Sequence, residues 1–466
     1  MKFLEAIRNI FRIPDLRRRV LFTLALLGVY RLGAHIPTPG INTEALAQIF
    51  QQYAGTWLGL VDLFSGGNFR QMSIFALGIM PYITASIILQ LMTVVWPYLE
   101  RLKKEGALGQ RKITQYTRYL TVFLSAFQGL MIALTLMRTT AGGQAQLVLN
   151  PGMGFILMTV LTLTTGTMFI MWLGEQISDR GIGNGMSLLI FAGIVVGLPR
   201  AIMELYSTRY LTGQWGLIEF LLLGALMLVV VAVIVYVEGG QRRIPVQYAK
   251  RIVGRKMMGG AMSYLPIRVN TGGVIPVIFA SSILTFPQTV AAVWPDNPVL
   301  KSVSDQLAWG MPLYTLLYIV GILFFCYFYV SIIFNPDEVA DNMRKWGGFI
   351  PGIRPGRHTS EYLNTVLTRL TFVGGVYLAL ISIIPEWMIA GIHLNRLPVW
   401  LGGAFFENYF PTWILDGLGV QFYFGGTSLL IVVGVAMDTV NQIEAQLTMR
   451  HYEGFTTHGR IRGRRS

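Results

Sequence analysis

The sequence contains ten long apolar stretches, and the connections between them alternate between rich and poor in Lys and Arg. The N-terminal segment, every second connection and the C-terminal tail together hold 30 of the 37 Lys and Arg residues. Cytoplasmic loops of membrane proteins retain Lys and Arg, whereas a soluble protein has no reason to sort its charges in this way. The alternation therefore predicts a polytopic membrane protein with ten spans and with both termini in the cytoplasm.

The ten stretches have the length and composition of membrane-spanning helices. A helix needs about 20 apolar residues to cross a hydrocarbon core about 30 Å thick, and 53% of the chain is hydrophobic whereas 13% is charged. We expect the first stretch to remain in the protein, because no small-residue cleavage site follows it. The single cysteine, Cys326, lies in the eighth stretch and cannot form an intramolecular disulfide. The predicted spans are 20–37, 74–96, 118–137, 153–174, 184–203, 215–237, 273–292, 312–334, 367–388 and 423–445.

The order of the spans predicts two halves of opposite orientation. Five spans precede the short connection 204–214 and five follow it, so we divide the chain into 1–208 and 209–466. Because five is an odd number, the second set must cross the membrane in the opposite sense to the first. Inverted halves create a cavity at their interface, which serves a transporter and a pore equally well.

A short amphipathic segment follows the first span on the outward side. Its apolar residues recur at positions i, i+3, i+4 and i+7, which lie on one face of a helix. These residues are Trp57, Leu60, Val61 and Phe64. A helix of about 12 residues is roughly 18 Å long, too short to span a bilayer. The segment ends in Ser65, Gly66 and Gly67, and it fits either a helix lying on the membrane surface or a re-entrant piece inside the bundle.

The cytoplasmic connection 238–272 has more order than a topological signal requires. Apolar residues alternate at Ile244, Val246 and Tyr248, which predicts a strand, and Arg255 and Lys256 are expected on its return turn. Basic residues held on ordered elements favour a docking surface for an acidic partner over a solvated loop.

The cytoplasmic connection 335–369 also has more order than a topological signal requires. Pro and Gly recur through 350–356, and this density predicts a rigid turn that holds Arg354 and Arg357 outward. We therefore predict that the two connections dock a partner, with Arg242 and Arg243 contributing from the first of them.

The sequence offers no arrangement of residues for covalent chemistry. The segment 181–185 is rich in Gly but lacks the Lys and Ser or Thr of a phosphate-binding loop, so we expect a tight turn between spans four and five. We take Asp438, toward the cytoplasmic third of span ten, as the only acid clearly inside a span, whereas ion-coupled carriers keep charges near the bilayer centre. The five histidines are scattered, at 35, 358, 393, 451 and 458. We therefore expect that the protein is not an enzyme and that it binds no cofactor or metal. The alternative functions are an inverted-repeat transporter and a lipid-processing membrane enzyme.

Nine motifs in this chain closely resemble those of the SecY family, the channel subunits of the bacterial protein-export translocon. They occur in the order of the family and cover essentially the whole chain. They are FSGG at 64–67, FALGIMPYI at 75–83, GQRKITQYTRY at 109–119, WLGEQI at 172–177, RGIGNG at 180–185, GQRRI at 240–244, GVIP at 273–276, PGIRPG at 351–356 and FGGTS at 424–428. The resemblance implies a passive channel for unfolded polypeptides, with an hourglass pore between two halves.

The resemblance also implies the parts of the pore. Its waist would be a ring of apolar side chains: Ile79, Ile83, Met186, Ile190, Ile278 and Ile431. Two pairs in this ring are spaced i, i+4 and so share a helix face, and a narrow apolar waist blocks ions by dewetting. The segment 57–69, from Trp57 to the glycines of its end, would be a plug outward of the ring, with Ser65, Gly66 and Gly67 as its hinge.

The resemblance further implies a lateral exit and a set of partners. Hydrophobic segments would leave between spans two and three on one side and seven and eight on the other, where the polar residues are Thr84, Gln90, Gln128, Asn270 and Ser282. The basic connections would dock the SecA ATPase or the ribosome through Arg242, Arg243, Arg255, Lys256, Arg354 and Arg357. SecE and SecG subunits, secretory precursors with their signal sequences, and lipids complete the expected partners in a bacterial plasma membrane. The aromatic-rich connection 389–422 is longer than the family leads us to expect.

Overall fold

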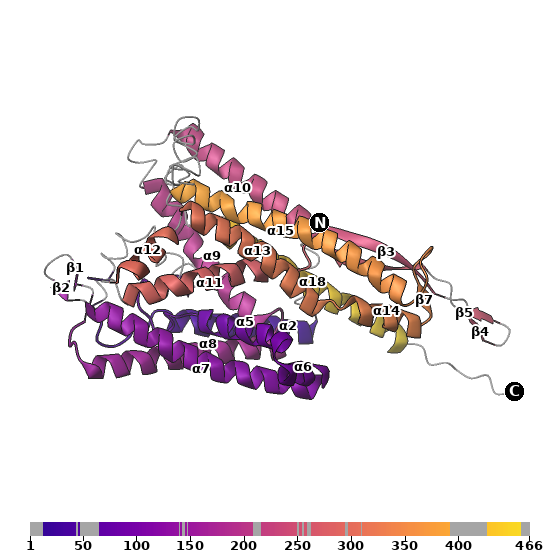
Figure 1. The fold of residues 1–466 in the computed structure, drawn as a ribbon, viewed down its shortest axis with the longest axis horizontal. Coiled ribbons are helices and arrows are strands. Elements are labelled where there is room, and N and C mark those ends of the chain that lie inside the picture. Colours follow the sequence, from indigo (N-terminus) through magenta and orange to yellow (C-terminus); the bar gives the residue numbers. More distant parts are fainter. Residues whose placement is uncertain are drawn as a thin grey trace. The chain divides into compact units, whose positions relative to one another are not determined.

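The computed structural model describes residues 13–42, 45–46, 65–138, 140–141, 145–146, 148–207, 216–248, 251–253, 256–258, 262–293, 297–308, 310–391 and 426–457. Most of these residues are helical, and the chain forms two compact units (Figure 1). The first unit comprises Met1–Ile202, Ala292–Trp294 and Ile431–Ser466. The second comprises Met203–Ala291 and Pro295–Leu430. The predicted segment at 57–64 and most of the connection 389–422 lie outside the described residues.

The first unit is built from long helices that pack side by side. Its helices are α2 (Pro14–Gly33), α5 (Met80–Val95), α6 (Pro97–Lys104), α7 (Ala107–Arg138), α8 (Met153–Arg180), most of α9 (Gly185–Leu205) and most of α18 (Gly426–Thr457). α7 packs along α8 and against α5, and α2 packs against α8 (Figure 1). A short hairpin of β1 (Thr140–Ala141) and β2 (Ala145–Gln146) follows α7. α6 turns away from α5 by 97° at Trp96, whose extended backbone precedes Pro97 and ends the helix.

The second unit combines helices with a small sheet. Its helices are α10 (Leu217–Glu238), most of α11 (Ile275–Val293), α12 (Pro298–Gln306), α13 (Pro312–Ile333), α14 (Pro336–Lys345) and α15 (Arg357–Ala390). β3 (Gln241–Tyr248) pairs antiparallel with both β6 (Met262–Arg268) and β7 (Gly348–Phe349). β4 (Arg251–Val253) pairs with β5 (Lys256–Met258). α15 packs against α13 and α14, and β7 lies at the α14 end (Figure 1).

A helix lies within each of the ten predicted spans, but its ends differ in several cases. Residues 74–79 form turns rather than helix, so α5 begins at Met80, next to Pro81. α7 and α15 begin about ten residues before their predicted spans, because polar residues continue the helix beyond the apolar core.

Six helical segments of the described residues are long and apolar enough to cross a membrane, or seven if the bent pair α5 and α6 is one span. α9 and α11 contain Pro199 and Pro287, and their apolar parts are shorter. The prediction of a mostly helical, multi-pass membrane protein is confirmed. The count of ten crossings stays a prediction, and the predicted halves, 1–208 and 209–466, are likewise not tested by the division into units.

Candidate functional site

Three buried side chains fix the turn that follows the predicted plug segment. The Tyr30 hydroxyl on α2 donates to the carbonyl of Ser65 at 3.1 Å, and the Asn68 amide donates to the Tyr30 oxygen at 3.0 Å. The Ser65 hydroxyl in turn accepts from the backbone N–H of Phe69 at 3.2 Å. This network is local to the first unit and ties the turn to α2.

The two glycines of the same turn have left-handed backbones but different surroundings. Gly66 has φ +73° and Gly67 has φ +82°, a region that residues with a Cβ atom adopt only at a cost. A Cβ atom on Gly66 would overlap the Cα atom of Gly193 on α9, whereas one on Gly67 would meet nothing within 4 Å. Gly66 is therefore required for close contact with α9, and Gly67 only for its backbone conformation.

Phe75 anchors the segment between the turn and α5 by packing between α2 and α8. The Phe75 ring stacks between Tyr30 and Phe169, with ring centroids 5.8 and 6.0 Å apart. Gly33 on α2 and Gly166 on α8 leave the space for Phe75 and for the carbonyl of Ile74, since a Cβ atom on either glycine would clash with them. This packing fixes the start of α5.

Five of the six predicted ring residues are buried. Ile79 and Ile83 lie one turn apart at the start of α5, where the N–H of Ile83 donates to the carbonyl of Ile79 at 3.1 Å. Met186 is half-buried and its sulfur lies against Gly174 of α8. The other buried members are Ile190 on α9, Ile278 on α11 and Ile431 on α18. A ring would require residues from both units, so the ring stays a prediction.

The Gly-rich segment 181–185 forms a tight turn between α8 and α9, as predicted. The N–H of Ile182 donates to the Thr23 hydroxyl on α2 at 3.1 Å, and that of Gly183 to the Gln442 amide oxygen on α18 at 3.0 Å. The N–H of Gly185 donates to the Ser178 hydroxyl at 2.9 Å. The turn thus connects four helices of one unit and positions the first residues of α9, including Met186.

An ion pair that the sequence analysis missed joins two of the motifs. Arg118 on α7 donates from Nε and Nη2 to the two carboxylate oxygens of Glu175 on α8, at 2.9 and 2.8 Å. The side chains are 48% and 18% exposed, so water screens the pair only in part. The two residues are 57 positions apart, and no local pattern pairs them.

The polar residues predicted at the lateral exit mostly bond within their own elements. Thr84 donates to the carbonyl of Met80 and Ser282 to that of Ile278, each one turn earlier. The Gln90 amide donates to the Ser86 hydroxyl on the same helix, and Gln128 is half-buried on α7. Asn270, which is buried, donates to the Glu238 carboxylate at 2.6 Å. The exit itself stays a prediction.

The described parts of the connections 238–272 and 335–369 form one folded body, which we call the docking platform after its predicted role: β3, β6, β7, α14 and the first turns of α15. Gln247 and Tyr248 of β3 pair with Phe349 and Gly348 of β7, so strands from the two connections are joined directly. The predicted strand is confirmed, and Ile244 is buried in it. The platform core consists of Ile244, Ile267, Val330, Ile350, Leu363 and Leu367.

The turn before α15, predicted to be rigid from its Pro and Gly content, is hydrogen-bonded within itself and to the first turn of α15. The N–H of Ile353 donates to the carbonyl of Ile350 at 3.0 Å, and the Thr359 hydroxyl donates to the carbonyl of Arg354 at 2.9 Å. Gly352 and Gly356 supply left-handed backbone with φ +83° and +100°. Beside this turn, the Ser360 hydroxyl hydrogen-bonds to Asp337 of α14.

Four of the six predicted docking arginines and lysines are exposed on this platform. Arg242 and Arg243 are exposed on β3, and Arg354 is exposed in the turn. The Arg357 side chain is 90% exposed and pairs with Glu361 at 3.1 Å. Lys256 begins β5, and Arg255 lies outside the described residues. The geometry thus gives the platform a basic surface on a packed base.

One expectation about buried charge is wrong: Asp438 is not the only acid inside a predicted span. Glu386 lies within span nine, is 1% exposed, and accepts from the Thr315 hydroxyl at 2.6 Å and from the N–H of Gly310 at 3.3 Å. It stands four residues before the end of α15, toward the predicted outward side. The flanking Pro385 and Trp387 make this region look like a span end in the sequence, so hydropathy alone gave Glu386 no weight.

Among the described residues, no group of three His, Cys, Asp or Glu side chains could hold a metal ion.

The chain is similar to known proteins over most of its length. A sequence model of the SecY family matches residues 73–440. The protein translocase subunit SecY of Streptomyces galbus is 49% identical over 462 residues, with 97% of this chain and 99% of that protein covered. The subunit of the same name from Escherichia coli strain K12 is 46% identical over 452 residues, with 96% of each covered.

Solved structures share the fold at low sequence identity. A protein-conducting channel aligns with a TM-score of 0.57 and 16% identity, over 92% of this chain and 91% of that one. Sec61 in the canine ribosome–channel complex from the endoplasmic reticulum aligns with a TM-score of 0.54 and 14% identity, over the same shares.

Proposed function

The chain belongs to the SecY family, and from this premise we propose that it is the protein-conducting subunit of a bacterial translocase. It passes unfolded secretory polypeptides across the plasma membrane and releases hydrophobic segments sideways into the bilayer. The observation that carries this proposal is the 49% identity to a translocase subunit over nearly the full length of both chains. The multi-pass helical fold and the basic docking platform support it.

The waist of the proposed channel is the ring of Ile79, Ile83, Met186, Ile190, Ile278 and Ile431. Apolar side chains exclude water and ions from a narrow passage. They make no directional hydrogen bonds, so they accept a polypeptide of any sequence. The five isoleucines are buried, which supports a role for them in an apolar lining.

The plug segment closes the channel on its outward side and moves on the hinge Ser65, Gly66 and Gly67. The hydrogen bonds of Tyr30 and the contact of Gly66 with Gly193 hold the hinge in the resting protein. These contacts are the two neutral hydrogen bonds of Tyr30 and one backbone contact. A neutral hydrogen bond is worth about 1 kcal/mol net, so a passenger polypeptide can displace these contacts.

The docking platform binds the partner that drives transport, either the SecA ATPase or the ribosome. Its exposed arginines suit the acidic surface of a protein or the phosphates of ribosomal RNA. We further propose that SecE and SecG complete the complex, that the chain itself supplies no energy, and that both termini lie in the cytoplasm. The seam for lateral release runs beside Thr84, Gln90, Gln128, Asn270 and Ser282, whose weak polar contacts separate when a hydrophobic segment partitions out.

A stalled secretory precursor tests the proposal. The full complex is reconstituted, with a photo-reactive amino acid in place of Ile190 and, as the matched control, in place of Leu189, the neighbouring buried residue on another face of α9. We expect the precursor to cross-link to position 190 and not to position 189. If neither position, nor any other ring position, reaches the precursor in transit, the chain does not conduct polypeptides through this waist.

A further inference from the structure

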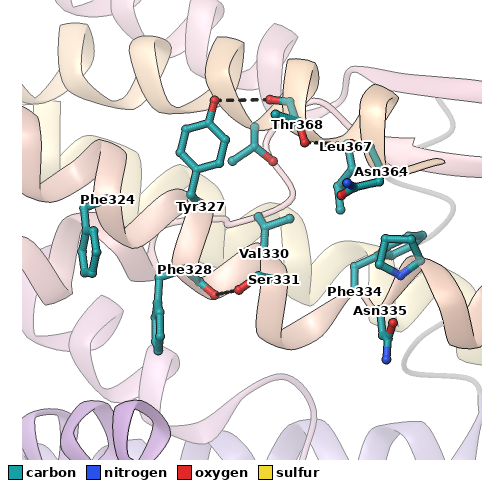
Figure 2. A pocket seen from close by; sticks show the side chains of 12 residues that line it. Phe324, Tyr327, Phe328, Val330, Ser331, Phe334, Asn335, Asn364, Leu367 and Thr368 are labelled. Atoms are coloured by element: carbon teal, nitrogen blue, oxygen red, sulfur yellow. Dashed lines mark hydrogen bonds between the residues drawn. The ribbon is translucent and has the colours of Figure 1, made fainter. Parts of the chain in front are cut away.

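A hollow of about 450 Å³ opens on the side of the second unit, between α13 and α15. Phe324, Tyr327 and Phe328 of α13 line it, with the Tyr327 ring turned toward Thr368 of α15, and Asn335 and Asn364 lie at the end next to α14 (Figure 2). The rings of Phe324 and Phe328 stack one helical turn apart, with centroids 6.1 Å apart and planes 12° apart. The hollow is therefore aromatic along α13 and polar at the end next to α14.

The hollow lies beside a helix that is long and apolar enough to cross a membrane. α13 belongs to a segment with mean hydropathy 2.4, of which only 28% of the apolar window is buried in the protein. Phe324 is 57% exposed on this face. In the bilayer an empty hollow of this size would leave its aromatic wall without contacts, which costs dispersion energy. An apolar chain from a lipid of the bilayer would restore these contacts.

A buried polar group shows where a ligand could bond. Thr371 lines the hollow, is 4% exposed, and its hydroxyl has no hydrogen-bond partner among the described residues. Unpartnered buried hydroxyls are costly, so such a group calls for a ligand atom. An ester carbonyl accepts a hydrogen bond from a hydroxyl and carries no charge. Of the twelve described residues that line the hollow, none is charged.

We propose that this hollow binds one glycerophospholipid of the cytoplasmic leaflet. An acyl chain lies along the rings of Phe324 and Phe328, and its ester region meets the hydroxyl of Thr371 and the amides at the α14 end. Since the lining lacks Lys and Arg, the site recognises the chain and ester region and not the charge of the headgroup. The proposal requires only that α13 and α15 lie in a bilayer in the predicted orientation, and it stands apart from the proposed channel function.

The bound lipid also supports the docking platform. Val330 and Leu367 line the hollow and belong to the platform core, and Phe334, which also lines the hollow, packs against that core. A lipid in the hollow therefore packs against the base of the platform.

The test compares two threonines on α15. The hydroxyls of Thr365 and Thr368 both donate to the carbonyl four residues earlier, at 2.9 and 2.8 Å, and both residues are exposed. Only Thr368 lines the hollow. The full chain is extracted in mild detergent and its retained phospholipid is counted by native mass spectrometry. We expect Thr368→Trp to fill the hollow and to lower lipid occupancy at least about tenfold, whereas Thr365→Trp retains it.

A smaller substitution tests the hydrogen bond to the lipid, and a cross-link tests which molecule occupies the hollow. Thr371→Val keeps the shape and removes the hydroxyl, so occupancy should fall about threefold to tenfold, the scale of one neutral hydrogen bond. A benzophenone amino acid in place of Phe328 should give lipid adducts. Equal occupancy in all variants, peptide adducts instead of lipid adducts, or occupancy that follows headgroup charge would each overturn the proposal.

Discussion

Replacing Gly66 by alanine should make the resting channel leaky, and replacing Gly67 should not do so to the same extent. Both positions have left-handed backbones, at φ +73° and +82°. For a residue with a Cβ atom, this backbone conformation is less favourable by about 1–2 kcal/mol. Only at Gly66 does the added Cβ atom also overlap the backbone of Gly193 on α9.

The difference between the two variants isolates the contact with α9. Forcing an extra methyl group into a packed contact costs about 1–3 kcal/mol. If this cost falls on the closed state, the ratio of open to closed channels rises about 5- to 150-fold in Gly66→Ala relative to Gly67→Ala. The backbone cost cancels in this comparison because both variants bear it.

Ion conductance in planar bilayers measures this ratio directly. The full complex is incorporated without a precursor, and the open fraction of single channels is recorded for the parent and for both variants. Equal open fractions for Gly66→Ala and Gly67→Ala, with both proteins folded, would refute the argument that contact with α9 holds the hinge closed.

Three further outcomes follow from the same geometry. Arg354→Glu should abolish motor-driven export of a precursor while the chain still inserts in the membrane, which an export assay with purified motor would show; unchanged export would contradict the docking role. Glu386→Leu removes the carboxylate that accepts from the Thr315 hydroxyl and from the N–H of Gly310, and should lower stability by about 1–3 kcal/mol, whereas Glu386→Gln, which keeps an acceptor, should lower it less in thermal unfolding. A double-mutant cycle of Arg118→Ala and Glu175→Ala should give a coupling of about 1 kcal/mol or less, since the pair is partly screened, and a coupling near zero would show that the two helices do not depend on it.

The sequence by itself determined what depends on short stretches of chain. Hydropathy and the alternation of Lys and Arg placed a helix in each predicted span, because the preference for lipid is summed residue by residue along a helix. The period-two pattern at Ile244 and Val246 predicted β3, and the Gly-rich segment 181–185 predicted a turn. The motifs predicted the family, which the comparisons confirm.

The tertiary structure decided which distant residues meet. The pairing of Arg118 with Glu175, the donors that bond to Glu386, and the strand pairing of Tyr248 with Gly348 all join residues 57 to 100 positions apart. No local pattern encodes such pairs, because the energy of a buried polar contact depends on its partner and not on its neighbours in sequence. In a hydropathy profile one acid near a span end is a small penalty, and only the packed helices show that one oxygen of the Glu386 carboxylate accepts two hydrogen bonds.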